Sequence, residues 1–321
     1  MWRRGAFVVV LIAAHLFGAG ATAQAADTVR VAKPSNTTWA FLPLDVGDAE
    51  GIFARYGIAV EISGLGGDAK IQQALAADSL DVGLGSGPSM AFVAKGSPVI
   101  TVAAFAGAPR NLSIIIAADS TIKSAADLKG KSLSITTVGS LTEWLVKRVS
   151  VQEGWGPDGI KGVALGGFDA ATAALKTHQI DGMTASTENG YFMEEHGMGR
   201  VFLGMEKYAP EFHAHVIFAR QSLVASNPDL VRRFLQGFFA SIAFMKANKE
   251  KTTAIAMRVL DRSATSMNKT YDDEIAMLED DGNFDPKAIE VLKQSFVDMN
   301  ILTTKPSDDQ ILTTAFVPVK P

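Results

Sequence analysis

The sequence lacks cysteine entirely, and it lacks any cluster of positive charge. Without cysteine the chain has no disulfide, no thiol nucleophile and no cysteine for lipid attachment, so its stability must come from a hydrophobic core. The 30 Lys and Arg residues stand against 34 Asp and Glu residues and are spread singly, with no basic stripe and no interleaved aromatic side chains. These absences exclude a nucleic-acid partner and a basic membrane-binding face.

Familiar catalytic motifs are also missing. The chain contains no G-x-S-x-G nucleophile elbow and no Walker loop, and Glu194-Glu195-His196 lacks the second histidine of a zinc-protease pattern. His213 and His215 alternate on one expected strand and could hold a metal, but two histidines without a third ligand are more often hydrogen-bonded structural residues. We therefore expect no catalytic residue, no bound metal and no cofactor.

Long hydrophobic runs are scarce, and the one at the amino terminus is short. Arg3 and Arg4 precede an apolar stretch from Ala6 to Phe17, and small residues then lead to Ala23-Gln24-Ala25. This order is typical of a secretory signal peptide that is cleaved before Ala26, and the stretch is too short to span a bilayer. Cleavage leaves a net charge of 28 minus 34, or -6. We expect a monomer in the periplasm, with no membrane span in the mature chain.

What the sequence does contain is a regular alternation of strand-like and helical segments. The run from Ile71 to Phe105 predicts helix, strand, helix and strand around the turn Gly85-Ser86-Gly87-Pro88. A second α/β series extends from Leu112 to Phe212, and the remainder after a further strand is mainly helical. Such alternation indicates an α/β fold with parallel sheets, whose ligands gather at the carboxyl ends of the strands.

The second series lies between two parts of the first, which predicts two lobes. We expect residues 1–25 to be the signal peptide, residues 26–110 and 214–321 to form a discontinuous first lobe with the carboxyl-terminal helices, and residues 111–213 to form the second lobe. Two chain crossings, near Ala108 to Leu112 and near Phe212 to Ile217, would then act as a hinge.

Turns rich in small and hydroxyl residues follow several expected strands, at Ser35 to Thr38, Gly64 to Asp68, Gly85 to Ser89, Thr136 to Thr142 and Thr184 to Glu188. Their N–H groups, hydroxyls and helix amino termini suit a small anion or a neutral polar ligand, although the same residue types also form ordinary turns and caps. The expected ligand-binding residues are Asn36, Thr37, Thr38, Trp39, Gly66, Gly67, Ser86, Gly87, Thr137, Ser140, Phe168, Ser186 and Glu188.

Some of these residues have a second interpretation. Ser140-Leu141-Thr142-Glu143 matches a capping box, which would use the polar groups of that turn within its own helix. Trp39 and Phe168 could close over a planar ligand or belong to the core. Glu188 could bind an amine on the ligand or stabilise the start of a helix, and the second reading is favoured.

The order of these segments resembles that of the periplasmic solute-binding proteins for nitrate, sulfonate and taurine, an NMT1/THI5-like and SsuA-type family. The most specific match is ALAADSLDVGLGSGPSMAFVAKGSPVITVAA, which follows the family's helix, Asp-Val-Gly strand, polar turn, helix and Gly-x-Pro. The segments DAEGIFARYGIAVEI, SAADLKGKSLSI and NPDLVRRFLQGFFASIAFM support it, and the resemblance covers Asp27 to about Ile301.

This resemblance implies a type II periplasmic-binding-protein fold, in which two α/β lobes joined by a two-crossing hinge close over one small ligand. It also implies delivery of that ligand to the membrane permease and ATPase subunits of an ABC importer. A sulfonate or related small organic acid is the favoured ligand, and a pyrimidine-like heterocycle of the thiamine-precursor type is the alternative. An extracytoplasmic enzyme that uses His213, His215 or Glu188, and a sensory binding protein, are less favoured functions.

Overall fold

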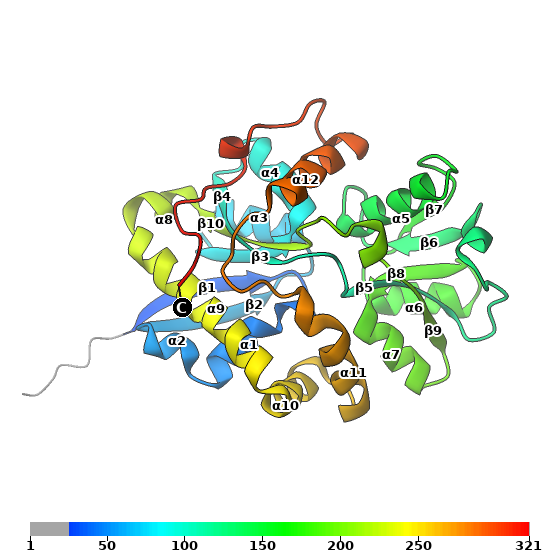
Figure 1. The fold of residues 1–321 in the computed structure, drawn as a ribbon, viewed down its shortest axis with the longest axis horizontal. Coiled ribbons are helices and arrows are strands. Elements are labelled where there is room, and N and C mark those ends of the chain that lie inside the picture. The colour runs from blue at the N-terminus through cyan, green and yellow to red at the C-terminus, as the bar shows by residue number, and fades with distance from the viewer. Residues whose placement is uncertain (1–25, 321) are drawn as a thin grey trace, which may run out of the picture.

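The computed structural model describes residues 26–320, so the expected signal peptide lies outside the described residues. Two five-stranded sheets, each flanked by helices, lie beside one another in Figure 1. We call each sheet with its helices a lobe: the first carries both the amino-terminal strands and the carboxyl-terminal helices, and the second is drawn in green. The expected two-lobed α/β architecture is confirmed.

The first sheet has the strand order β2-β1-β3-β10-β4. Strand β1 pairs in parallel with β2 and β3, whereas β10 runs antiparallel between β3 and β4. The strands are β1 (Asp27–Lys33), β2 (Ile58–Gly64), β3 (Val82–Ser86), β4 (Val99–Ala106) and β10 (His215–Arg220). The helices among them are the 3-10 helix η1 (Trp39–Phe41), α1 (Leu42–Ala49), α2 (Ile52–Arg55), α3 (Asp68–Ala76) and α4 (Met90–Ala94).

The second sheet repeats this plan with the order β7-β6-β8-β5-β9. Strand β6 is parallel to β7 and β8, and β5 runs antiparallel between β8 and β9. The elements are β5 (Leu112–Ala117), β6 (Ser132–Ile135), α5 (Leu141–Gln152), β7 (Lys161–Ala164), α6 (Phe168–Lys176), β8 (Gly182–Ser186), α7 (Thr187–Glu195) and β9 (Gly199–Gly204).

The expectation of wholly parallel sheets is wrong, because β5 and β10 run against their neighbours. These are the strands by which the chain enters each sheet after crossing from the other lobe. Leu112, the first residue of β5, pairs with Ser186, the last residue of β8. His215 at the start of β10 likewise pairs with Ser86 at the end of β3. A strand that begins at the carboxyl edge of its neighbours must run antiparallel to them.

The two crossings lie side by side. The N–H of Ala214 donates to the carbonyl of Gly107 at 3.0 Å, which joins the return crossing to the outward one. Both crossings lie at the carboxyl edges of the strands, so the hinge adjoins the edge where ligands bind in α/β folds. The expected lobe boundaries at residues 110 and 213 fall within these crossings and stay a proposal.

The carboxyl-terminal helices cover the first sheet, and two of them also reach the second lobe. They are α8 (Gln221–Ser226), α9 (Pro228–Ala247), α10 (Lys249–Leu260), α11 (Ala264–Glu274) and α12 (Pro286–Asp298). Helix α11 packs against α7 of the second lobe (Figure 1). Near α12, the indole of Trp144 on α5 stacks on Phe212 at 4.5 Å and its N–H points to Asp298 at 3.5 Å. The lobes therefore touch on both sides of the crossings.

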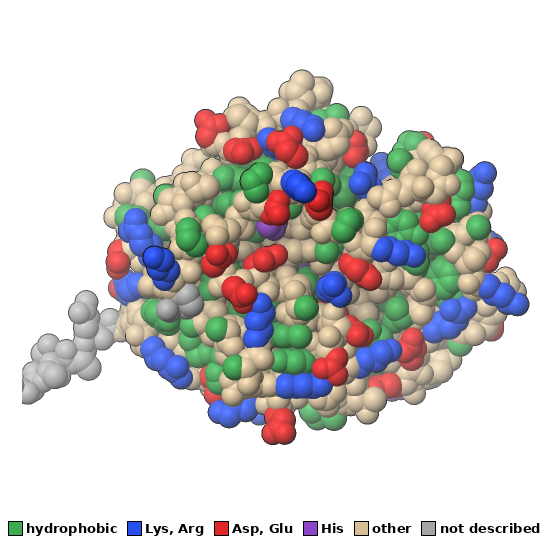
Figure 2. Space-filling model, in the orientation of Figure 1, with side chains coloured by type: hydrophobic (Ala, Val, Ile, Leu, Met, Phe, Trp, Pro, Cys, Tyr) green, Lys and Arg blue, Asp and Glu red, His purple; other side chains and the backbone are tan. Residues whose placement is uncertain are grey.

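The core follows from the apolar pattern of the sequence. Strands β4 and β5 are buried along their whole length, and on α9 the fully buried Phe238 packs against Phe105 of β4 while Phe234 stacks on Phe53 of α2. Burying one such side chain stabilises a fold by about 1.5–3 kcal/mol. No helix within residues 26–320 combines the length and apolar character that a bilayer crossing requires. Figure 2 shows basic and acidic side chains intermixed over the face drawn there, as their scatter in the sequence predicts.

Candidate functional site

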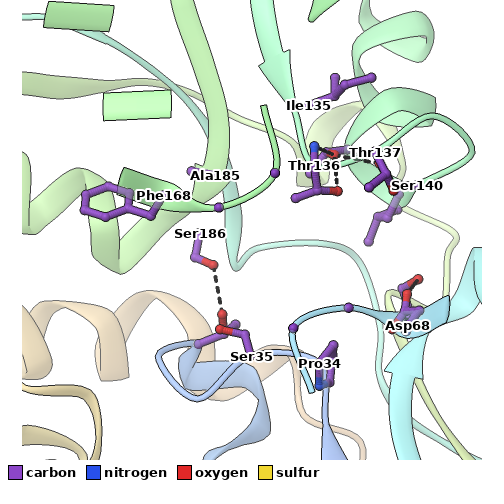
Figure 3. Close-up of a pocket in the computed structure, with 18 of the residues that line it drawn as sticks. Pro34, Ser35, Asp68, Ile135, Thr136, Thr137, Ser140, Phe168, Ala185 and Ser186 are labelled. Atoms are coloured by element: carbon purple, nitrogen blue, oxygen red, sulfur yellow. Dashed lines mark hydrogen bonds between the residues drawn. The ribbon is translucent and has the colours of Figure 1, made fainter. Parts of the chain in front are cut away.

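A cavity of about 880 Å³ is lined by residues of both lobes at the carboxyl ends of the strands. Its wall in the first lobe comes from the loop after β1, the loop after β2 and the end of β3. Its wall in the second lobe comes from the loops after β6 and β7 and the end of β8. Figure 3 shows Pro34, Ser35 and Asp68 facing Thr136, Thr137 and Ser140 across this space.

The lining is rich in hydroxyl groups and contains few charges. Within the described part of the chain, Asp68 and the exposed Lys70 are the charged residues that line it. Three aromatic side chains, Phe41, Phe92 and Phe168, supply apolar surface. The amino termini of α3, α5 and α6 also border the cavity, but each of these helices carries an acidic residue in its first turn. Such a wall binds through directed hydrogen bonds and apolar contact more than through net charge.

The structure brings most of the expected ligand-binding residues to this one cavity. Those that line it are Asn36, Thr37, Thr38, Gly66, Gly67, Ser86, Thr137, Ser140, Phe168 and Ser186. They come from the ends of six separate strands, as expected from the rule that strand ends of one edge meet in space. Trp39, Gly87 and Glu188 are not among the lining residues.

Trp39 and Glu188 lie in the junction between the lobes. Both residues are fully buried, and the backbone N–H of Trp39 donates to Oε1 of Glu188 at 3.1 Å. The indole of Trp39 packs edge-on against Tyr271, with ring centroids 6.3 Å apart. Neither side chain faces the cavity in this arrangement, so the expected stacking on a planar solute and pairing with an amine have no geometric support here.

Gly87 lies directly after β3 and allows the second crossing to pack closely against the end of this strand. Its N–H donates to the carbonyl of Ala214 at 2.9 Å, so this donor is used within the protein. A Cβ at position 87 would lie 2.1 Å from the carbonyl oxygen of His213, a distance that real Cβ atoms do not reach. The N–H of Gly87, which was expected among the ligand-binding groups, is therefore not free to bind a solute.

Ser86 and Asp68 form a polar pair on the wall of the first lobe. The hydroxyl of Ser86 donates to Oδ2 of Asp68 at 2.5 Å, and the Ser86 N–H points to the same carboxylate. Burial raises the pKa of Asp68, while the hydrogen bonds from Ser86 oppose that rise. Because Ser86 gives its proton to a carboxylate, its oxygen lone pairs remain available to accept from a solute. The pair does not have the serine–histidine contact of an activated nucleophile.

The turn before α5 contains one of the two hydrogen bonds of the expected capping box. Ser140 caps the helix by accepting the N–H of Glu143 at 3.3 Å, as predicted. The carboxylate of Glu143 reaches one residue further back than a capping box requires and accepts the N–H of Gly139 at 2.5 Å. Thr142 accepts the N–H of Thr136 at 2.9 Å. Much of the polar capacity of this turn therefore serves the turn itself.

The sequence interpretation missed a polar pair at the hinge. The amide of Asn111, in the first crossing, lies 3.0 Å from Nε2 of His215, the first residue of β10. Both residues line the cavity. The imidazole packs against the rings of Phe41 and Phe105, at centroid distances of 4.8 and 5.7 Å. Burial lowers the pKa of His215 to about 4, so the ring is neutral near pH 7.

No local pattern points to the Asn111 and His215 pair, because the contact exists only once both crossings are in place. Asp68 and Thr136 were within turns that the sequence singled out, whereas Phe92 carried no such signal. The Phe92 side chain is 41% exposed, which is unusual for a large apolar residue and is explained by its place on the cavity wall.

The two lobes also touch directly across the cavity. The hydroxyl groups of Thr38 and Ser186 lie 3.3 Å apart, and Figure 3 shows this bond running from Ser186 to the loop after β1. With the bond between Trp39 and Glu188, it closes one side of the space. These contacts must break if the lobes separate.

The histidines do not form a metal site in the described residues, where no group of three His, Cys, Asp or Glu side chains is placed to hold an ion. Nε2 of His213 accepts the N–H of Asp285 at 2.8 Å, and burial lowers the pKa of this histidine to about 4. Both His213 and His215 therefore serve as hydrogen-bonded structural residues.

Comparisons with known proteins agree with this architecture. The family model described as "NMT1/THI5 like" matches residues 39–252. No curated protein sequence matches the chain. The alkanesulfonate-binding protein SsuA from Xanthomonas axonopodis pv. citri, bound to MOPS, is similar in structure, with a TM-score of 0.77 and 15% identity over 90% of this chain and 98% of that one.

Two further solved structures are similar to this chain, and one is a binding protein while the other is an enzyme. The periplasmic aliphatic sulphonate binding protein SsuA from Escherichia coli has a TM-score of 0.74 and 18% identity, covering 90% of this chain and 92% of its own. The desulfurization enzyme DSZB, in a complex with biphenyl-2-sulfinic acid, has a TM-score of 0.65 and 15% identity, covering 90% and 97%. These likenesses confirm the expected periplasmic-binding-protein fold.

Proposed function

Because the chain belongs to the NMT1/THI5-like family, we propose that it captures a small organic solute in the periplasm and delivers it to an ABC importer. The observation that carries this proposal is the cavity of about 880 Å³ lined by both lobes beside two adjacent crossings. Its size suits a small organic molecule. Motion about the crossings would bury the solute and give the permease a closed form to recognise.

For the ligand, we favour a sulfonate or related small organic acid. The amino terminus of α6 and the hydroxyl of Thr137 offer directed donors for acid oxygens, whereas the Ser140 hydroxyl already bonds within its own turn. Phe41, Phe92 and Phe168 suit an apolar body attached to the acid group. The absence of a buried cation among the described lining residues argues for a single diffuse charge on an organic molecule, rather than a small inorganic anion.

A pyrimidine-like heterocycle is the second candidate, and one observation favours it. The carboxylate of Asp68 and the amide of Asn111 both line the cavity and are hydrogen-bond acceptors, which an amino-substituted ring would satisfy. An organic acid would have to avoid the Asp68 carboxylate. The heterocycle would thus place its amino group against Asp68 of the first lobe or Asn111 of the crossing, whereas the acid group would lie on the second lobe.

The test is a thermal-shift screen of the mature protein with MOPS, taurine, benzoate and 4-aminopyrimidine. A solute that binds only the native state stabilises it by about 2.7 kcal/mol at 100 times its Kd. We expect the sulfonates to raise Tm, and we expect this increase to level off as the sulfonate concentration rises. A shift with 4-aminopyrimidine alone would move the assignment to the heterocycle, and no shift with any of the four would contradict the proposed ligand classes.

A binding protein releases its solute unchanged, which distinguishes the proposed function from the enzyme alternative. Within the cavity, Ser86 donates to Asp68 and His215 is held by Asn111, so the described lining places no histidine against a hydroxyl nucleophile. We expect any solute that shifts Tm to be recovered unchanged after prolonged incubation. Product detected by mass spectrometry would support the enzyme alternative instead.

A further inference from the structure

A second polar cluster joins the lobes beside the cavity, and its two central carboxyl groups are not among the lining residues. Glu188, the second residue of α7, is fully buried, and its Oε1 accepts the N–H of Trp39 from the first lobe. Its Oε2 has no hydrogen-bond partner among residues 26–320. A buried carboxyl group with only part of its hydrogen-bonding capacity filled is costly when ionised. Ligand capture does not require a group of this kind in the junction.

A second buried carboxyl group faces this junction from α11. Glu274 is fully buried, and within the described chain neither of its carboxyl oxygens has a partner. The hydroxyl of Thr270, one turn earlier on α11, and the indole N–H of Trp39 are also buried without partners there. Because α11 packs against α7, the unsatisfied groups of both lobes share one interface (Figure 1).

The charges around the two carboxyl groups do not neutralise them. The guanidinium of Arg262 favours ionised Glu188, but its Nη2 donates to Asn189 at 2.8 Å and its plane lies over Phe192 at 4.5 Å. Asp273 disfavours a charge on Glu274. The other ionisable groups of this interface are Tyr191, whose hydroxyl bonds to Asp273, together with Glu194 and with Lys269, which lies over the Tyr191 ring. Two cations, Arg262 and Lys269, thus face four carboxyl groups, those of Glu188, Glu274, Asp273 and Glu194.

Protonation is the simplest way for this interface to stay closed. Burial raises the pKa of Glu188 to about 7, against the opposing effect of its own N–H, the Trp39 N–H and Arg262. Burial, and then the charge of Glu188, raise the pKa of Glu274. When the lobes part, both groups meet water and return toward ordinary values near 4.5. The closed form therefore binds protons more tightly than the open form, so acid favours closure and rising pH favours opening.

We propose that Glu188 and Glu274 form a proton-operated latch between α7 and α11, which holds the lobes together when protonated and loosens when ionised. It acts on the lobes themselves and needs no solute. The ratio of closed to open molecules should fall by up to about tenfold per pH unit, for each proton released, between pH 4.5 and about 7. A solute bound between the lobes would add to closure at every pH.

The absence of cysteine makes the latch directly measurable. Lys95 and Lys129 are exposed residues of the first and second lobes, so cysteines introduced at both can carry a pair of dyes on the ligand-free mature protein. Single-molecule energy transfer from pH 4.5 to 8 then reports the open fraction. We expect it to rise with pH in the wild type and to stay low and flat in Glu188→Gln/Glu274→Gln, whose amides match the shape of the acid but cannot ionise.

Glu250→Gln is the matched control, because Glu250 is an exposed carboxylate on α10 of the same lobe as Glu274. It should keep the pH response of the wild type. A wild type whose open fraction does not change with pH would overturn the latch, as would a double variant that keeps the response. If the double variant does not fold, the single variants decide: each must weaken the response, and an unchanged response in both overturns the proposal. None of these outcomes depends on which solute is captured.

Discussion

At the scale of single residues, Gly87 is required because the structure leaves no space for a side chain at this position. The sequence presents it as a donor at the edge of a ligand site, yet the structure uses its missing side chain. The carbonyl of His213 and the side chain of Leu292 occupy the space that a Cβ would need. The second crossing can approach β3 only because this residue is glycine.

Gly87→Ala should therefore destabilise the protein by about 1–3 kcal/mol, since a methyl group would force backbone apart at the hinge. Urea unfolding at constant pH measures the loss. Gly167→Ala is the matched control, because Gly167 has an ordinary φ of -85° and no atom within 4 Å of an added Cβ. Equal unfolding free energies for the two variants would show that the close approach at Gly87 is not a constraint.

At the scale of elements, the helix starts were predictable because capping is local. Asn227 caps α9, and its Oδ1 accepts the N–H of Leu230 at 3.2 Å, with Pro228 and Asp229 in the first turn as expected. Ser140 caps α5 in the same way. Each cap is fixed by residues within one turn of the chain, so no tertiary information is needed to find it.

Asn227→Ala should reduce the free energy of unfolding by about 1 kcal/mol, because it leaves a helix N–H without a partner. Asn227→Ser, which retains an acceptor oxygen, should restore most of the loss. The measurement is the midpoint of thermal unfolding of all three proteins. If the alanine and serine variants unfold together below the wild type, the side-chain cap is not the cause.

The burial of two predicted site residues, Trp39 and Glu188, could not be predicted from the sequence. Trp39 and Glu188 follow strand-end turns just as the lining residues do, and their local patterns are the same. What removes them from the cavity is α11, which brings Tyr271 and Glu274 from far along the chain. The order of strands and helices was likewise predictable, whereas the reversed direction of β5 and β10 depends on where the crossings meet the sheets.

At the scale of the whole molecule, the structure separates recognition from closure. The cavity between the lobes supplies hydroxyls and helix amino termini from both sides. The buried carboxyl groups of Glu188 and Glu274 lie outside its lining, at the junction of α7 with α11, which borders the cavity at Asn189. A solute and a proton can therefore both favour the closed form while acting on different residues.

The central claim is that the space between the lobes binds a solute, and calorimetric titration of the mature protein with MOPS tests it most directly. Gly167 lines the cavity in open space, so Gly167→Trp should fill part of it without disturbing the core. We predict saturable binding of one MOPS molecule to the wild type and at least a tenfold weaker Kd in Gly167→Trp, about 1.4 kcal/mol. Equal affinities in the two proteins, or no saturable binding to the wild type, would contradict the account.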